Sequence, residues 1–137
     1  MSEPIFLEEL AKYLEDNSVG TRGLPNSGSG WGIYIIHRPD KADKMITLTP
    51  IPSSSDPEIP VSSPSFQVML VAKDTQQAML KAQDINNLLH RKQAVEMDNI
   101  YAYYFACTVM PYPIGIDDNH RAMIVMEFDA MLRGQYV

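Results

Sequence analysis

Residues 65–89, SFQVMLVAKDTQQAMLKAQDINNLL, carry the clearest structural signal in the chain. Phe66, Val68 and Leu70 recur at every second position, which is the period of a β-strand with one buried face. Asp74 follows, and its carboxylate can accept hydrogen bonds from the first backbone N–H groups of a helix. The next apolar side chains recur at helical spacing: Ala78, Ala82, Ile85 and Leu89. The stretch therefore predicts a strand followed by a helix.

Two more strands are expected on the C-terminal side of this helix. Residues 100–110 are rich in aromatic and β-branched side chains, and residues 122–133 alternate between apolar and other side chains. Residues 111–119 between them contain two prolines, a glycine and an Asp-Asp-Asn run, which favour a turn. We expect an antiparallel pair of strands joined by this turn.

The N-terminal part predicts a helix and two strands. Apolar residues recur at helical spacing over residues 5–14. Residues 31–36 and 45–49 are rich in aromatic and β-branched side chains and predict two strands joined by a tight polar connection. Segregated strands with two helices are typical of an α+β fold. We expect a mostly antiparallel sheet with the two helices packed on one face.

Residues 50–64 interrupt this pattern with five prolines and five serines. Such a composition cannot sustain a helix or a central strand. A connection of this length inside a compact domain is uncommon and is often functional. We therefore expect a single domain over residues 1–137, with an extended arm or loop at 50–64 that contacts a partner.

Composition narrows the function classes. The formal net charge is -6, which disfavours binding of nucleic acid through a broad basic face. The chain has one cysteine, so no disulfide can form within it, and an intracellular context is expected. Residues 1–10 lack the basic start and apolar run of a secretory signal, and no apolar stretch reaches the roughly twenty residues that span a bilayer. We expect no membrane partner.

Candidate catalytic and metal-binding groups are few. Asp117, Asp118 and His120 are metal-ligand types, but no second cluster in the sequence completes a coordination shell, and Asp and Asn are also the residues that turns select. Cys107 lies in a predicted strand, and the three histidines are scattered, so a nucleophile and base pair would need tertiary contacts. We expect no catalytic residue, metal ion or cofactor.

The order of elements carries a family resemblance over residues 5–133. Its motifs are Phe66-Gln67-Val68 through Lys73-Asp74, the helical stripe with Leu88-Leu89, and Pro111 to Pro113 with Gly115-Ile116-Asp117-Asp118-Asn119 before a final strand. In these features the chain resembles the tail-terminator and minor capsid (head-tail joining) proteins of long-tailed bacteriophages.

The resemblance implies a structural role in the virion. Members form a ring, commonly of six subunits, on the head-proximal end of the tail tube, where it stops polymerisation and offers a docking face to the head connector. The implied partners are further copies of the chain, the tail tube protein and the connector protein, with DNA only passing through a channel. The protein would be made in the bacterial host cytoplasm. No catalysis is implied.

A closed ring requires two different complementary surfaces on each subunit. The Pro/Ser-rich arm can supply one, and an edge strand over residues 33–36 can pair across subunits. The alternatives are a monomeric adaptor that uses the arm, another head-tail completion protein, or a small enzyme using Cys107 or the acidic turn. The candidate interface residues are Ile33, Ile35, Pro52, Pro57, Ile59, Pro60, Asp117 and Asp118.

Overall fold

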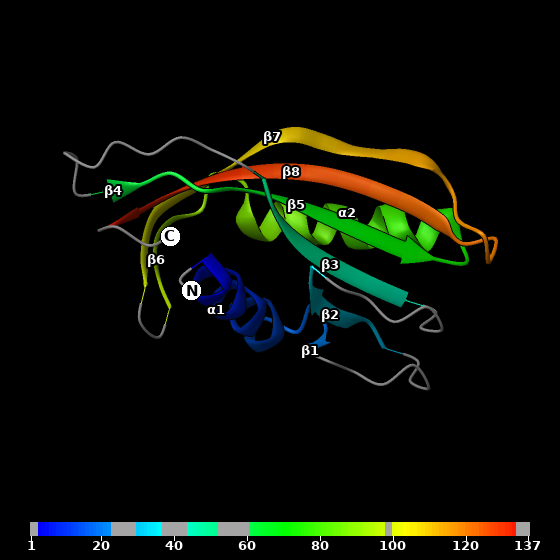
Figure 1. Ribbon diagram of the computed structural model, residues 1–137, viewed down its shortest axis with the longest axis horizontal. Coiled ribbons are helices and arrows are strands. Elements are labelled where there is room, and N and C mark those ends of the chain that lie inside the picture. Colours follow the sequence, from blue (N-terminus) through cyan, green and yellow to red (C-terminus); the bar gives the residue numbers. More distant parts are fainter. Residues whose placement is uncertain (1–2, 23–29, 37–43, 52–60, 98–99, 134–137) are drawn as a thin grey trace.

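The computed structural model describes residues 3–22, 30–36, 44–51, 61–97 and 100–133 (Figure 1). Within these ranges the chain forms two helices and one eight-stranded sheet. The strand order is β1-β2-β3-β5-β8-β7-β6, and β4 pairs with β8 beside this path. The elements in chain order are α1 (Glu3–Asp16), β1 (Thr21–Arg22), β2 (Gly32–Ile35), β3 (Lys44–Ile51), β4 (Val61–Ser62), β5 (Ser65–Ala72), α2 (Thr75–Leu89), β6 (Gln93–Glu96), β7 (Tyr101–Ile116) and β8 (Ala122–Arg133).

The sheet is mostly antiparallel, as predicted. β3, β5, β8, β7 and β6 pair in antiparallel succession. β1, β2 and β3 instead pair in parallel, with Gly32 opposite Met45 and Ile35 opposite Leu48. The predicted tight connection between the β2 and β3 segments is therefore wrong. Parallel neighbours require the chain to travel back along the strand before the second one begins, which a tight turn cannot do.

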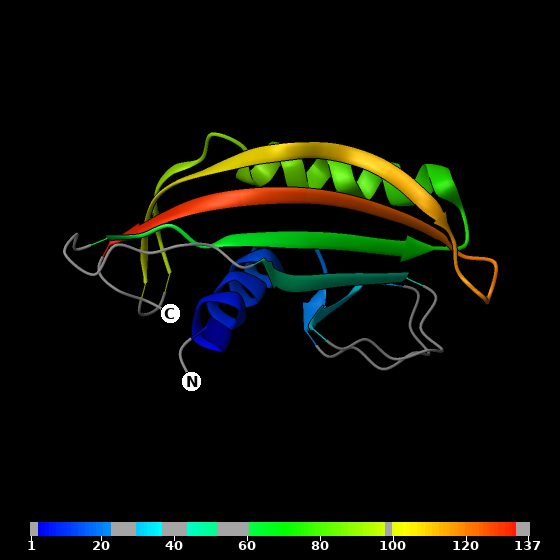
Figure 2. The ribbon, with the colours of Figure 1, turned by 45° about the horizontal axis from the view of Figure 1, so that its top comes forward.

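Both helices pack on the same face of the sheet, which confirms the predicted α+β arrangement (Figure 2). Phe6 of α1 lies edge-on to Phe66 of β5 at a centroid distance of 5.7 Å. Phe66 also stacks on Phe128 of β8 at 5.5 Å and meets Phe105 of β7 edge-on at 6.3 Å. Because the buried side chains of α2 belong to the same apolar cluster, the two helices share one core with β2, β3, β5, β6, β7 and β8.

The start of α2 follows the sequence prediction closely. Asp74 is the N-cap, and its carboxylate accepts a hydrogen bond of 3.0 Å from the backbone N–H of Gln76. The buried residues of α2 are Ala78, Ala82, Ile85 and Leu89, which are the predicted stripe. Two alanines in this stripe have small side chains, so the helix backbone lies close to the sheet.

β7 is longer than predicted. The sequence placed a turn over residues 111–119, but β7 continues to Ile116, and the turn occupies residues 117–120. Pro111 and Pro113 are accommodated because β6 pairs with β7 only between Tyr101 and Tyr104. A proline lacks the N–H of a ladder bond, which costs little on a side of a strand that has no partner.

The Pro/Ser-rich segment is only partly described. Pro50 and Ile51 continue β3, opposite Phe66 and Ser65, beyond the part of β3 that β2 covers. Val61 and Ser62 form β4 and pair with the end of β8. The predicted arm over 50–64 therefore begins and ends in strands, while residues 52–60 lie outside the described ranges. Its role as an arm stays a prediction.

The phenylalanine cluster makes a direct stability prediction. Phe66→Ala should lower the free energy of unfolding by about 3–5 kcal/mol, because Phe66 is fully buried and contacts three other rings. Urea unfolding followed by circular dichroism measures this change. Leu80→Ala is the matched control, since Leu80 is 57% exposed on α2 and should change stability by no more than about 0.5 kcal/mol. Equal losses in both variants would contradict the proposed core.

Candidate assembly surfaces

The outer edge of β7 is only half covered. β6 pairs with β7 from Tyr101 to Tyr104. The backbones of Arg91 and Lys92 extend this ladder by two hydrogen bonds to Phe105, of 2.9 and 3.0 Å. Among the residues that the structure describes, no strand lies on the outer side of residues 108–116. This second half of β7 is therefore an edge of the sheet.

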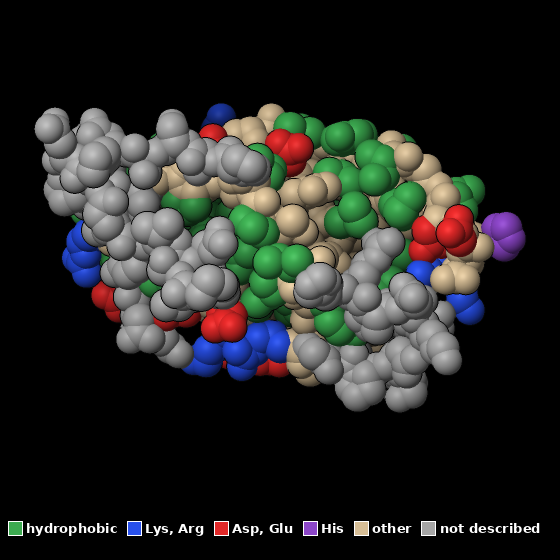
Figure 3. All heavy atoms as spheres, in the orientation of Figure 1, with side chains coloured by type: hydrophobic (Ala, Val, Ile, Leu, Met, Phe, Trp, Pro, Cys, Tyr) green, Lys and Arg blue, Asp and Glu red, His purple; other side chains and the backbone are tan. Residues whose placement is uncertain are grey.

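Apolar side chains are concentrated on that edge. Met110, Tyr112, Ile114 and Ile116 are 60%, 44%, 43% and 68% exposed, and we call these four residues the β7 apolar row. β7 contains sixteen residues, YAYYFACTVMPYPIGI, and none of them is charged. Figure 3 shows hydrophobic side chains gathered over the part of the molecule where β7 and β8 lie. A contiguous exposed apolar surface of this kind is typical of an association site.

Prolines restrict how a partner can bind this edge. Natural edge strands are usually protected by charges, prolines or irregular register. β7 has no charge, but it has Pro111, Pro113 and register shifts in its pairing with β8 between Cys107 and Gly115. Because proline has no N–H, a second strand cannot form a continuous ladder here. Side-chain packing on the β7 apolar row is therefore the contact that this edge favours.

The His90 side chain binds the backbone of β7 near the middle of the strand. Its Nδ1 accepts a hydrogen bond of 3.0 Å from the backbone N–H of Cys107. His90 is the C-cap of α2, so this bond ties the end of the helix to the point where the cover of β6 stops. The bond also satisfies an N–H that would otherwise face outward from the sheet edge.

Cys107 does not have the surroundings of an activated nucleophile. Its thiol donates to the carbonyl oxygen of Val109 at a sulfur–oxygen distance of 3.2 Å. Burial raises the pKa of the Cys107 thiol above its ordinary value, and the hydrogen bond with Val109 offsets this only in part. The nitrogen of His90 that faces Cys107 binds its backbone. This geometry favours a protonated, structural thiol over a thiolate paired with a base.

The turn between β7 and β8, which we call the hairpin tip (residues 117–121), is organised by one ion pair. Asp117 accepts hydrogen bonds from the backbone N–H groups of Asn119 and Arg121, at 3.0 and 2.9 Å. The Arg121 guanidinium binds the same carboxylate through Nε and Nη2, each at 2.8 Å. The Arg121 side chain is only 5% exposed. A buried guanidinium of this kind needs its carboxylate partner.

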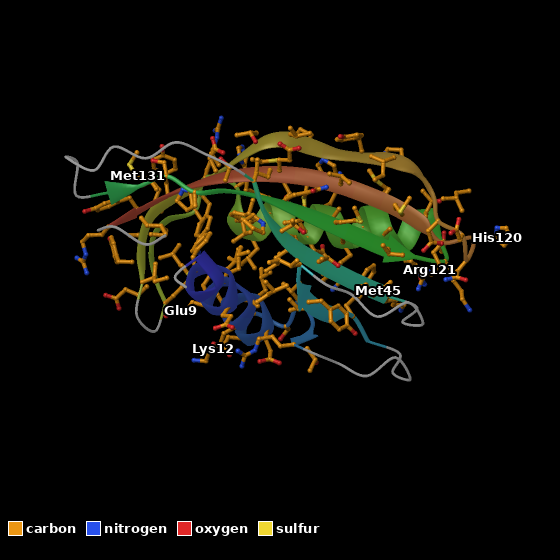
Figure 4. The ribbon with its side chains drawn as sticks, viewed as in Figure 1. Glu9, Lys12, Met45, His120, Arg121 and Met131 are labelled. Carbon is orange, nitrogen blue, oxygen red and sulfur yellow. The ribbon has the colours of Figure 1, made fainter. Side chains whose placement is uncertain are left out.

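These contacts decide what the acidic tip can do. Burial acts to raise the pKa of Asp117, but the hydrogen bonds from Arg121 and Asn119 outweigh it and hold the pKa below its ordinary value of 3.8. Both carboxylate oxygens of Asp117 therefore serve the turn. Asp118 and His120 are exposed, and His120 points away from the body of the molecule (Figure 4). Within the described residues, no group of three His, Cys, Asp or Glu side chains could hold a metal ion.

The other predicted interface residues lie in different surroundings. Ile33 is 2% exposed and belongs to the core, and β1 pairs with the outer side of β2 at Gly32 and Ile33. The prediction of a free edge over residues 33–36 is therefore wrong for its first residue. Ile35 is half-buried and packs against the core. Pro52, Pro57, Ile59 and Pro60 lie outside the described residues.

The β7 apolar row was not among the predicted interface residues. Its signal is present in residues 110–116, MPYPIGI, where Met, Tyr and Ile occupy every second position. The prolines and the glycine between them led to a turn assignment. A period-two apolar pattern interrupted by prolines is equally typical of an edge strand.

The described residues thus combine an exposed apolar sheet edge with a hairpin tip held by an ion pair. Residues 13–133 match the family model of bacteriophage tail terminator proteins. The chain belongs to this family. The match spans every strand described above and all of α2. No curated protein matches the chain. None of the described helices is long and apolar enough to cross a membrane.

Family membership confirms the resemblance read from the sequence and assigns the tail terminator a structural place in the phage tail. A structural family of this kind implies a non-enzymatic protein. The match includes β7 and the hairpin tip, so the β7 apolar row and the Asp117–Arg121 ion pair both lie within the matched residues. We therefore treat these features as candidate assembly surfaces.

Acid should weaken the hairpin tip of the terminator. Because the folded pKa of Asp117 is lowered, its carboxylate stabilises the fold above about pH 3.8, and this contribution is lost as the pH falls through the lowered folded value. Asp117→Asn should therefore be less stable than the natural chain at pH 7, and the difference should shrink below pH 3.8. Urea unfolding of both proteins across this range measures it. A difference that grows in acid would contradict the assignment.

Removing the His90 side chain should loosen the middle of β7. His90→Ala leaves the Cys107 N–H without its acceptor, which should cost about 1 kcal/mol of unfolding free energy and speed amide exchange at Cys107. Denaturant unfolding and hydrogen exchange measure the two effects. His120→Ala is the matched control, because His120 is exposed at the hairpin tip and should leave both unchanged. An unchanged rate of amide hydrogen exchange at Cys107 in His90→Ala would show that His90 does not stabilise the middle of β7.

Proposed function

We propose that this tail terminator acts as a closed ring of six copies on the head-proximal end of the tail tube. In this position the ring blocks addition of further tube subunits and offers its other face to the head connector. The partners are thus neighbouring copies of the chain, the tube protein and the connector protein. Membership of the tail terminator family supports the position on the tail.

The observation that carries the ring is the β7 apolar row. Its four residues are 43–68% exposed although apolar, which is unfavourable in water unless another surface covers them. A ring gives every copy such a cover, because each subunit contacts two neighbours through two different surfaces. The two edges of the sheet differ, with β1 at one end of the strand order and β6 beside β7 at the other. Because these two edges of the sheet differ, one edge of a subunit can contact the other edge of its neighbour, which is a head-to-tail contact.

The charge of the chain is compatible with a DNA channel. The net charge of -6 makes phosphate binding unfavourable on average, so DNA could pass a ring of such subunits without being held. Some acidic groups are already used within the subunit: Glu15 binds Arg22 at 3.0 Å, and Asp117 binds Arg121. Asp16 and Asp118 are among the acidic residues that remain exposed in the described part of the chain, and we take these two as candidates for a channel lining.

Oligomeric state tests the proposal directly. Size-exclusion chromatography with light scattering should give about six times the chain mass of 15.4 kDa, and electron micrographs should show rings with a central hole. Added to polymerising tube protein, the rings should stop elongation and leave tubes capped at one end. A monomer at high concentration that leaves tube length unchanged would refute the ring and favour the monomeric adaptor.

A further inference from the structure

We propose that neighbouring copies contact each other through opposite edges of their sheets, with the β7 apolar row of one copy packed on the end of β2 in a second copy. We call Tyr34, Ile35 and Ile36 the β2 end. This inference rests on the proposed ring, and it names the surfaces by which the ring closes.

The two surfaces match in their lack of charge. Residues 101–116 contain no charged side chain, and neither do residues 30–36, GWGIYII. Other uncharged stretches of the sheet belong to β3 and β5, which lie in the interior of the strand order, whereas β2 and β7 lie near its two ends. An apolar edge strand needs an uncharged partner, because burying an unpaired charge against it is costly. The chain itself therefore carries a surface of the required chemistry.

Their positions exclude contact within one molecule. β3, β5 and β8 lie between β2 and β7 in the strand order. Figure 1 shows β7 along one rim of the sheet and β2 near the opposite rim. A contact between them must therefore join two copies. Since the two surfaces differ, each contact leaves one of each kind free, and the series ends only when the ring closes.

Ile36 is the most distinctive residue of the β2 end. It is 47% exposed, although isoleucine is strongly apolar. Its φ of 67° lies in the left-handed region, which a β-branched residue rarely adopts. Its N–H still donates to the carbonyl oxygen of Leu48 at 2.9 Å, so pairing with β3 fixes this conformation. Nearly half of this apolar residue faces solvent, and contact with a second copy would bury it.

The form of the contact follows from the backbone. β1 already pairs with β2 at Gly32 and Ile33, so the approach of a neighbour is confined to the β2 end. On the other partner, Pro111 and Pro113 interrupt any ladder along β7. Apolar side-chain packing is thus the main interaction, and one buried charge should disrupt it strongly.

Three single substitutions test the pairing. Ile114→Glu places a charge in the β7 apolar row, and Ile36→Glu places one at the β2 end. Leu80→Glu is the matched control, because Leu80 is 57% exposed and belongs to α2, so it lies in neither the β7 apolar row nor the β2 end. Light scattering should give monomers for the first two variants and rings for the control. Circular dichroism and thermal unfolding should show the natural fold in all three.

Mixing the two edge variants shows whether the contact is head to tail. Ile114→Glu retains an intact β2 end, and Ile36→Glu retains an intact β7 apolar row. An equimolar mixture should therefore form dimers and nothing larger, while each variant alone stays monomeric. Dimers of Ile36→Glu alone would overturn the inference, since they would indicate pairing of β7 with β7.

The outcomes separate this inference from the proposed ring. Rings formed by Ile114→Glu or by Ile36→Glu would overturn the edge pairing and leave the ring intact. A natural chain that is monomeric at high concentration would overturn the ring itself, and the edge pairing with it. Rings of the natural chain, monomers of both edge variants and dimers in their mixture would establish the pairing.

Discussion

The contact of four phenylalanine rings fixes the geometry on which the rest of the terminator depends. The chain contains four phenylalanines, and Phe66 lies within 5.5–6.3 Å of the other three ring centroids. These rings come from α1, β5, β7 and β8, so one cluster joins the first helix to three neighbouring strands. Each ring buries a large apolar area, and edge-on and stacked contacts add to it. The cluster thus fixes the first half of β7, where Phe105 lies.

The second half of β7 has a different set of neighbours. Past Cys107, where His90 binds the backbone, β7 pairs with β8 on its inner side, and the described residues supply no outer strand. The hairpin tip closes this long pair through the buried Arg121 guanidinium. A strand anchored at both ends can hold an apolar row exposed without collapsing onto its own core. The exposed row is therefore a supported feature of the fold.

Local patterns predicted the elements whose determinants are local. The period-two run before Asp74 and the stripe of α2 predicted both elements because each is set by neighbouring residues. The predicted end of β7, at residue 110, was wrong because Pro113 is compatible with both a turn and an edge strand. Which of the two forms depends on whether a neighbouring strand pairs at that position, and the local sequence does not show this. The predicted tight connection between β2 and β3 was wrong because the two strands pair in parallel, and strand direction depends on the path of the chain between them. The β7 apolar row was not predicted because three of its four residues lie in the segment that was assigned to a turn.

Charge and apolarity act at different ranges in the proposed ring. A net charge of -6 makes identical subunits repel one another over roughly one Debye length, about 8 Å in physiological salt. Apolar contact acts only when surfaces touch, and the uncharged stretches of β2 and β7 add no local repulsion to it. Charge repulsion therefore disfavours encounters between subunits in arbitrary orientations. An encounter that aligns the two uncharged edges gains apolar contact that can offset this repulsion. In the proposed ring, acidic composition and uncharged edges would together favour one mode of association among copies.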